Sequence, residues 1–167
     1  MSQLVALSLS IGILGGIATG IFLSVPGLLI WAAFIAWACY FHNGGNNEAL
    51  KTTIIGNIFG AVVAWVAAFV LISMTPGGTL WAAIVVGVTV LVLCLAAHVK
   101  ALASIPSSVY GYASVFAYLL GNPTANLTKE ALTSASLQNA LIAVAVSMVI
   151  GAIFGMVSGK VGAALTK

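Results

Sequence analysis

Six apolar runs, separated by short polar breaks, dominate this sequence. They span roughly residues 4–23, 27–41, 49–72, 79–98, 107–120 and 137–157. A helix that crosses the hydrocarbon core of a membrane needs about 20 apolar residues, so 167 residues with short loops allow about six crossings. Only 4% of the residues are charged, against about 25% in a typical soluble domain. The runs therefore predict an all-α, polytopic membrane protein with six transmembrane helices in a single membrane domain, residues 1–167.

The composition leaves few side chains for chemistry. The chain has five lysines, two glutamates and two histidines, and its net charge of +3 is too small and scattered for nucleic acid. Acid–base catalysis needs positioned titratable groups, so we expect neither enzyme activity nor a cofactor. Cys39, His42, Cys94 and His98 have the number of ligands that zinc requires. Cysteine is common in apolar helices, however, and this spacing is not diagnostic, so we expect no metal.

Two short motifs recur in the same order along the chain. Ile55-Gly56-Asn57-Ile58-Phe59-Gly60 returns as Ile150-Gly151-Ala152-Ile153-Phe154-Gly155, and Ser24-Val25-Pro26 returns as Ser104-Ile105-Pro106. Because each half then has three crossings, the second half enters the membrane from the opposite face. We therefore expect a 3+3 inverted-topology repeat of residues 1–75 and 76–167, an arrangement typical of channels and transporters. The second half is lengthened by a polar segment, residues 122–136.

The second and fifth runs, 27–41 and 107–120, are short, follow the repeated proline and contain all four tyrosines. Short helices in corresponding repeat positions often form a permeation site, whereas an interfacial aromatic belt with core packing is the alternative. Asn57, near the middle of the third run, either bonds a neighbouring helix or contacts a permeant, and Thr52, Thr53, Ser107 and Ser108 are equally ambiguous. We expect a pore between the second and fifth helices, lined or narrowed by Trp31, Phe34, Trp37, Asn57, Tyr110, Tyr112, Ser114 and Phe116.

Glycines at four-residue spacing indicate tight helix packing in lipid. This applies to the first, third and sixth helices, through Gly16, Gly20, Gly56, Gly60, Gly151, Gly155 and Gly159. Such faces also predict a closed homo-oligomer. His42 and His98 fall at helix ends, where an exposed structural histidine is the simple interpretation and a pH-sensitive gate is the functional one.

The lysines predict the orientation in the membrane. Six crossings place Lys51, Lys100, Lys160 and Lys167 on the side of the termini, and only Lys129 on the other side. Because basic residues in short loops stay in the cytoplasm, we expect both termini there. The first run has no basic flank and no small-residue cleavage site, so we expect a mature first helix in place of a signal peptide.

The sequence also resembles a known family. The run Gly27-Leu28-Leu29-Ile30-Trp31-Ala32-Ala33-Phe34, then Ala38-Cys39-Tyr40-Phe41, Gly44-Gly45, Leu50-Lys51, Ile105-Pro106 and Ile153-Phe154-Gly155 are similar to a family of small bacterial inner-membrane proteins catalogued as a domain of unknown function. The resemblance covers nearly the whole chain and implies a location in the bacterial inner membrane. It brings no substrate and no functional residues. The polar segment 122–136 is longer than that family leads us to expect.

Three functions fit these observations. The first is a passive channel or facilitator for a small neutral solute such as urea or ammonia. The second is a secondary transporter, which the lack of a carboxylate within the apolar runs opposes, because coupled transporters commonly hold an ionisable residue in the membrane. The third is a structural or assembly subunit that packs against a larger partner.

Overall fold

The protein is a bundle of apolar helices. The computed structural model describes residues 1–74 and 78–166, and every regular element in this part of the chain is helical. Four helices are long and apolar enough to cross a membrane: α1 (Gln3–Ser24), α3 (Asn47–Ser73), α4 (Gly78–Leu95) and α8 (Ala140–Leu165). The chain is thus a multi-pass, all-α membrane protein. The boundary expected between the two half-domains falls between residues 75 and 76. Both residues belong to the segment 75–77, which lies outside the described residues.

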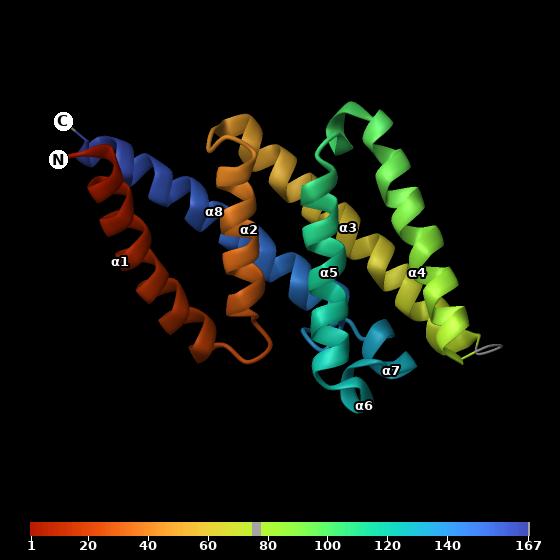
Figure 1. The fold of residues 1–167 in the computed structure, drawn as a ribbon. Coiled ribbons are helices and arrows are strands. Elements are labelled where there is room, and N and C mark those ends of the chain that lie inside the picture. Colours follow the sequence, from red (N-terminus) through yellow and green to blue (C-terminus); the bar gives the residue numbers. More distant parts are fainter. Residues whose placement is uncertain (75–77, 167) are drawn as a thin grey trace.

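Two shorter helices stand between the long ones. α2 (Ile30–His42) has 13 residues and α5 (Ile105–Gly121) has 17. Figure 1 shows both standing upright while α3 and α8 cross behind them at an incline. Two 3₁₀ turns, η1 (Ala96–His98) and η2 (Lys100–Leu102), connect α4 to α5. Both termini lie at the same end of the bundle, which we call the terminus end; we call the other the far end.

Local sequence signals set the helix boundaries. The side chain of Asn46 accepts a hydrogen bond of 2.8 Å from the Ala49 amide at the start of α3, and Asn139 accepts one of 3.0 Å from the Leu141 amide at the start of α8. Such caps satisfy amides that a helix leaves free in its first turn. Between α2 and α3 the chain reverses through Gly44 and Gly45, whose φ angles of +108° and +66° favour glycine.

Two regions differ from the expectation drawn from the sequence. The last helix does not end near residue 157 but continues to Leu165. It continues because Gly159 and Gly162, which resemble helix breakers, lie against Tyr40 and Leu7 and allow close packing. The polar segment 122–136 is also no simple loop, because it contains the short helices α6 (Pro123–Asn126) and α7 (Lys129–Thr133).

Glycines bring the backbones of two helix pairs together. A Cβ at Gly60 of α3 would overlap the Ser108 carbonyl of α5, and a Cβ at Gly151 of α8 would overlap the Ala33 carbonyl of α2. The α3–α5 and α2–α8 pairs are accordingly the two most extensive helix contacts. α1 packs on α8, and α4 packs on α3. The sequence prediction that the glycines of the third and sixth helices serve close packing matches this geometry.

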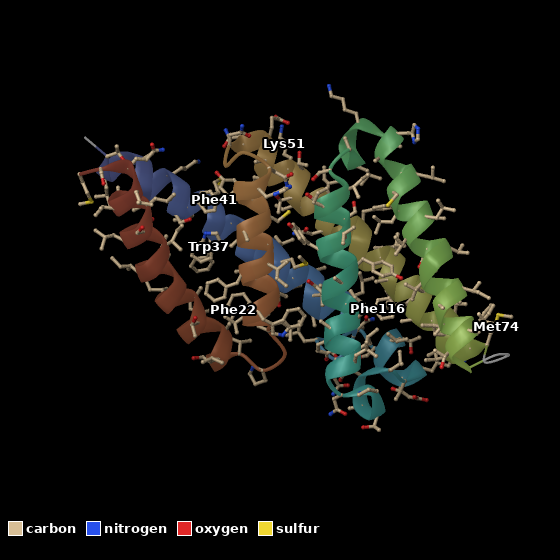
Figure 2. All side chains as sticks on the ribbon, viewed as in Figure 1. Phe22, Trp37, Phe41, Lys51, Met74 and Phe116 are labelled. Carbon is tan, nitrogen blue, oxygen red and sulfur yellow. The ribbon has the colours of Figure 1, made fainter. Side chains whose placement is uncertain are left out.

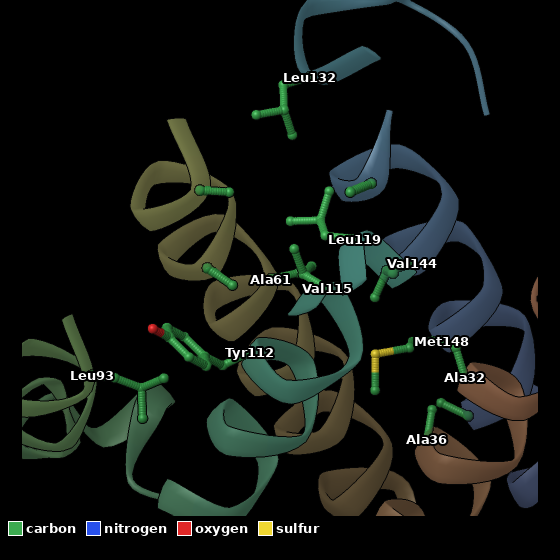
Figure 3. Packing of buried hydrophobic residues seen from close by; sticks show 14 residues of the cluster. Ala32, Ala36, Ala61, Leu93, Tyr112, Val115, Leu119, Leu132, Val144 and Met148 are labelled. Atoms are coloured by element: carbon green, nitrogen blue, oxygen red, sulfur yellow. The ribbon is translucent and has the colours of Figure 1, made fainter. Parts of the chain in front are cut away.

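The buried core lies where α2, α3, α5 and α8 meet. It is built mainly from alanines and branched aliphatic residues, with Met148 and Tyr112 among the larger members. Figure 3 shows Leu132 of α7 above Leu119 and Val115 of α5, so the far-end segment closes this core. By contrast, α1 and α4 expose most of their apolar side chains, as helices that face lipid do.

Candidate permeation site

Four of the six aromatic residues predicted to line one pore lie in two separate pairs, Phe34 with Trp37 and Tyr112 with Phe116. Trp37 is buried, and its ring stacks between those of Phe34 and Phe154, with centroid distances of 5.8 and 5.7 Å. Its Nε1 donates a 2.9 Å hydrogen bond to the Ser158 hydroxyl of α8. Phe34 lies within 3.6 Å of a Cβ built at Gly15 of α1. These rings therefore pack toward α1 and α8 and face away from α5.

The second aromatic group belongs to α5. The rings of Tyr112 and Phe116 lie 5.1 Å apart, and the Tyr112 hydroxyl shares a 2.8 Å hydrogen bond with Thr89 of α4. Figure 2 shows Trp37 on the α1 side of α2 and Phe116 on the α4 side of α5. Trp31 and Tyr110 are half-buried against the core. Phe34 and Trp37 thus lie apart from Tyr112 and Phe116, and the core between these two pairs is filled mainly by small and aliphatic side chains.

A polar cluster joins α2, α3 and α5 at the terminus end. The Asn43 amide donates to the hydroxyls of Thr53 and Ser107, each at 2.9 Å. Its carbonyl oxygen accepts a 2.9 Å bond from Ser104, which lies 2.7 Å from the Ser107 oxygen. Cys39 Sγ lies 3.3 Å from the same Ser107 oxygen. We call Cys39, Asn43, Thr53, Ser104 and Ser107 the Asn43 cluster.

Sequence reasoning did not select Asn43 or Ser104 as site residues. Asn43 stands in the loop after α2, and Ser104 stands before α5, so neither lies within an apolar run. Two signals pointed to them. Asn43 precedes the glycine pair that turns the chain back, and Ser104 belongs to the repeated Ser-Ile-Pro motif.

Four polar side chains have buried atoms with no hydrogen-bond partner within the described residues. One is the Trp81 indole of α4, and the other three lie deeper in the bundle. Both amide atoms of Asn57 and the hydroxyls of Ser108 and Ser114 are buried and unpaired. Asn57 is only 1% exposed, and Ser108 and Ser114 are equally enclosed. We call Asn57, Ser108 and Ser114 the central polar group. Of these, Asn57 and Ser114 were candidates from the sequence.

The central polar group lies along one contact line between two helices. A Cβ at Gly111 of α5 would meet the Asn57 backbone, with its Cα at 2.9 Å. Ser108 precedes Gly111 by about one turn, and Ser114 follows it by about one turn, since a helix has 3.6 residues per turn. Toward the terminus end, the same contact line between α3 and α5 reaches Thr53 and Ser107 of the Asn43 cluster. We call this contact line the α3–α5 seam.

The seam is covered at the far end by α7. Leu132 is fully buried, and its carbonyl oxygen accepts bonds of 2.9 Å from Trp65 Nε1 of α3 and 2.9 Å from the side-chain amide of Asn139. The Thr128 hydroxyl caps α7 by accepting from the Ala131 amide at 3.1 Å. Asn126 donates a 2.8 Å bond to the Tyr118 carbonyl and ties α6 to α5. The polar insertion is therefore anchored to three helices.

The two histidines lie apart from the seam. His42 is exposed at the end of α2, with its ring edge-on to Tyr110 at 6.3 Å. His98 is exposed in η1, and its Nδ1 lies 2.8 Å from the Leu95 carbonyl. Within residues 1–74 and 78–166, no three His, Cys, Asp or Glu side chains come together as metal ligands would. A pH-sensitive gate at these histidines stays a prediction.

Only some of the predicted packing glycines contact a neighbouring helix. Gly56, Gly60, Gly151, Gly155 and Gly159 lie against neighbouring helices. Gly16 and Gly20 of α1 do not, because a Cβ at either position would meet open space. Gly12, one turn earlier on the same helix face, is also open. The α1 stripe formed by Gly12, Gly16 and Gly20 thus contacts no other helix in the part of the chain that the structure describes.

Fold and site together define an α-helical multi-pass membrane protein that encloses unpaired polar groups between two closely packed helices. The chain belongs to the family DUF1097, described as protein of unknown function, whose profile matches residues 8–163. This match confirms the resemblance to a family catalogued as a domain of unknown function. No curated protein and no solved structure matches the chain.

Proposed function

We propose that the protein is a passive channel or facilitator for a small neutral solute, such as urea or a similarly sized amide, in a bacterial inner membrane. The observation that supports this proposal is the central polar group. The route that we propose follows the α3–α5 seam, in place of an aromatic slot between α2 and α5.

The energetic argument concerns buried polar atoms without partners. Each such atom costs about 1–3 kcal/mol, and Asn57 contributes two of them, with one more each from Ser108 and Ser114. A molecule that supplied partners would be stabilised by the same groups. Asn57 offers both a donor and an acceptor, and the hydroxyls offer either. An uncharged solute with donors and acceptors of its own, such as urea or an amide, fits this set.

The conformation described here is closed in this scheme, because the backbones of α3 and α5 touch along the seam at Gly60 and Gly111 and both of its ends are covered. The Asn43 cluster crosses the seam at the terminus end, and Leu132 covers it at the far end. Opening the terminus end requires Asn43 to leave Thr53 and Ser107. The neighbouring Gly44 and Gly45, both at positive φ, give the loop the freedom for such a movement.

The 3+3 inverted repeat is part of the same proposal. The equivalent motifs Gly56/Gly60 and Gly151/Gly155 pack against α5 and α2, the two helices that would correspond. Contacts along both pairs advance in the same direction, so each pair is parallel. The outer helices correspond too, because α1 covers α8 as α4 covers α3. Six crossings then require α2 and α5 to span the membrane together with the residues that precede them.

The lysines support cytoplasmic termini. α3 begins at the terminus end, where Figure 2 shows Lys51, and η2 with Lys100 also lies there, whereas Lys129 belongs to α7 at the far end. Lys160 lies in the last turns of α8. Lys167, the fourth lysine counted on that side, is outside the described residues. The basic excess favours the cytoplasm for the terminus end.

We also propose a homo-oligomer, with its interface on α1. Glycine in a helix costs about 1 kcal/mol relative to alanine, and the α1 stripe has no partner among residues 1–74 and 78–166. Small residues at four-residue spacing allow helices to approach closely in lipid. A second copy of α1 therefore accounts for this stripe.

Solute flux into liposomes tests the proposed function. We expect urea flux in the absence of any proton or sodium gradient, and about fivefold slower flux for Asn57→Ala, since one neutral hydrogen bond contributes about 1 kcal/mol. The matched control is Ser10→Ala, because Ser10 is equally buried but bonds the Ser158 carbonyl at 2.8 Å, away from the seam.

Other outcomes would assign a different function. Flux that requires a proton or sodium gradient would make the protein a secondary transporter. No flux of urea, ammonia or a small amide through the folded protein would favour a structural or assembly subunit.

A further inference from the structure

A charged hollow lies at the terminus end, and its lining includes none of the residues of the Asn43 cluster or the central polar group. Its volume is about 390 Å³, and its lining residues are Glu48, Lys51, Thr52, Ile55, Lys100 and Ala101. The lysines come from two segments, the second turn of α3 and the 3₁₀ turn η2, which pack against each other. The fold thus brings together two of the five lysines in the chain.

The charge balance of the hollow favours an anion. Lys51 Nζ lies 2.9 Å from Glu48 Oε1, and both side chains are more than half exposed. An exposed pair of this kind contributes little to stability, so Lys51 is free to exchange its partner. Lys100 forms no ion pair within the described residues. The Thr52 hydroxyl adds a donor, and the hollow carries a net charge of one positive unit.

An apolar face continues directly from the hollow along α3. Ile55 lines the hollow, and Ile58, Val62 and Val66 follow it at helical spacing. All four side chains are exposed, by 37 to 45%. Because residues spaced by three and four lie on one helix face, this face runs from Lys51 into the depth where acyl chains lie. A soluble anion would use only the hollow, whereas a phospholipid would use the hollow and the face together.

We propose that this hollow binds the headgroup of an anionic phospholipid. The phosphate lies between Lys51 and Lys100 and accepts from the Thr52 hydroxyl, while an acyl chain lies along Ile55, Ile58 and Val62. Glu48 excludes a second anion and sets a preference for a headgroup with one negative charge, such as that of phosphatidylglycerol. Basic hollows between membrane helices on the cytoplasmic side bind acidic headgroups in this way.

The test is a titration of the purified protein, in neutral detergent, with phosphatidylglycerol. Binding is measured by the rise in the temperature at which the protein unfolds. The variants are Lys51→Gln/Lys100→Gln and, as a control, Lys129→Gln, which removes the lysine at the far end. Each lysine near an acidic membrane surface contributes about 1 kcal/mol, so we expect the double variant to bind about thirtyfold more weakly. Lys129→Gln and the charge-preserving Lys51→Arg/Lys100→Arg should bind as the wild type does.

Two further titrations, one with phosphatidylcholine and one with inorganic phosphate, decide between a lipid and a free anion. Phosphatidylcholine should give no comparable stabilisation, and inorganic phosphate at millimolar concentration should give none. Equal stabilisation by inorganic phosphate would overturn the lipid proposal in favour of a soluble anion. Equal phosphatidylglycerol affinity for the wild type and the Gln double variant would overturn the site itself. The lysines are exposed, so the variants fold, and their unfolding temperatures without lipid verify this.

Discussion

Substituting Gly60 by alanine should separate α3 from α5. A Cβ at Gly60 would overlap the Ser108 carbonyl oxygen and would lie 2.7 Å from the Ser108 carbonyl carbon and 2.9 Å from the Tyr112 amide nitrogen. All three are backbone atoms, which cannot rotate away as a side chain can. To restore even the shortest ordinary contact of 3.4 Å to that carbon, α5 must move by at least 0.7 Å, the difference between 3.4 and 2.7 Å.

The expected cost follows from this overlap. Overpacking of a core costs about 1–3 kcal/mol, and we expect the upper end because the whole helix must shift. Alanine recovers about 1 kcal/mol of helix propensity relative to glycine. Gly60→Ala should therefore lower the free energy of unfolding by about 2 kcal/mol or more.

Gly87→Ala is the matched control for this prediction. Gly87 lies within α4, and a Cβ there would meet nothing within 4 Å. Both variants gain the same helix propensity. The difference between their free energies of unfolding therefore reports the cost of the overlap alone, and it should be about 3 kcal/mol.

The assay is unfolding in mixed detergent micelles of rising sodium dodecyl sulfate content, followed by tryptophan fluorescence. If Gly60→Ala and Gly87→Ala unfold at the same free energy, α3 and α5 do not approach through their backbones and the seam as described is wrong.

The remaining predictions concern the two ends of the seam and the α1 stripe. Leu132→Ala should cost about 3 kcal/mol, as for a large buried side chain, and should speed urea flux into liposomes; a folded variant with wild-type flux would show that α7 is not a barrier. Asn43→Ala removes three hydrogen bonds of the Asn43 cluster to hydroxyl groups and should also speed flux, so slower flux with normal folding would contradict a gate there. Gly16→Ile should shift the protein to monomers in lipid nanodiscs, measured by mass; an unchanged oligomer would exclude an interface on α1.

The helices and the tight packing could be predicted from the sequence because they depend on local pattern. In lipid, a long apolar run forms a helix, because a helix satisfies the backbone hydrogen bonds of the run internally. The predicted runs match α1 to α5 and α8 within a few residues, except at the end of α8. The Gly56/Gly60 and Gly151/Gly155 motifs signalled close approach through their spacing. The end of α8 was not predicted, because Gly159 and Gly162 serve close packing against residues that are distant in the sequence.

The candidate site was harder to predict, because it depends on which faces meet. Phe34 and Trp37 share a short helix with Trp31, and only the packing of α8 and α1 reveals that they turn away from α5. Asn57 could be singled out as a polar residue at mid-depth, but its lack of a partner depends on the residues around it. Leu132 lies in a polar segment, where nothing local distinguishes a buried leucine from an exposed one.

The most direct test of the proposed route is a high-resolution density map of the protein in lipid nanodiscs with urea at saturating concentration. The proposal predicts density for urea or for ordered water within hydrogen-bond distance of the Asn57 amide, close to the Ser108 and Ser114 hydroxyls. Asn57→Ala should lose that density while the helices keep their positions. A map in which the Asn57 amide bonds only to protein groups, with no density beside it, would contradict a route along the α3–α5 seam.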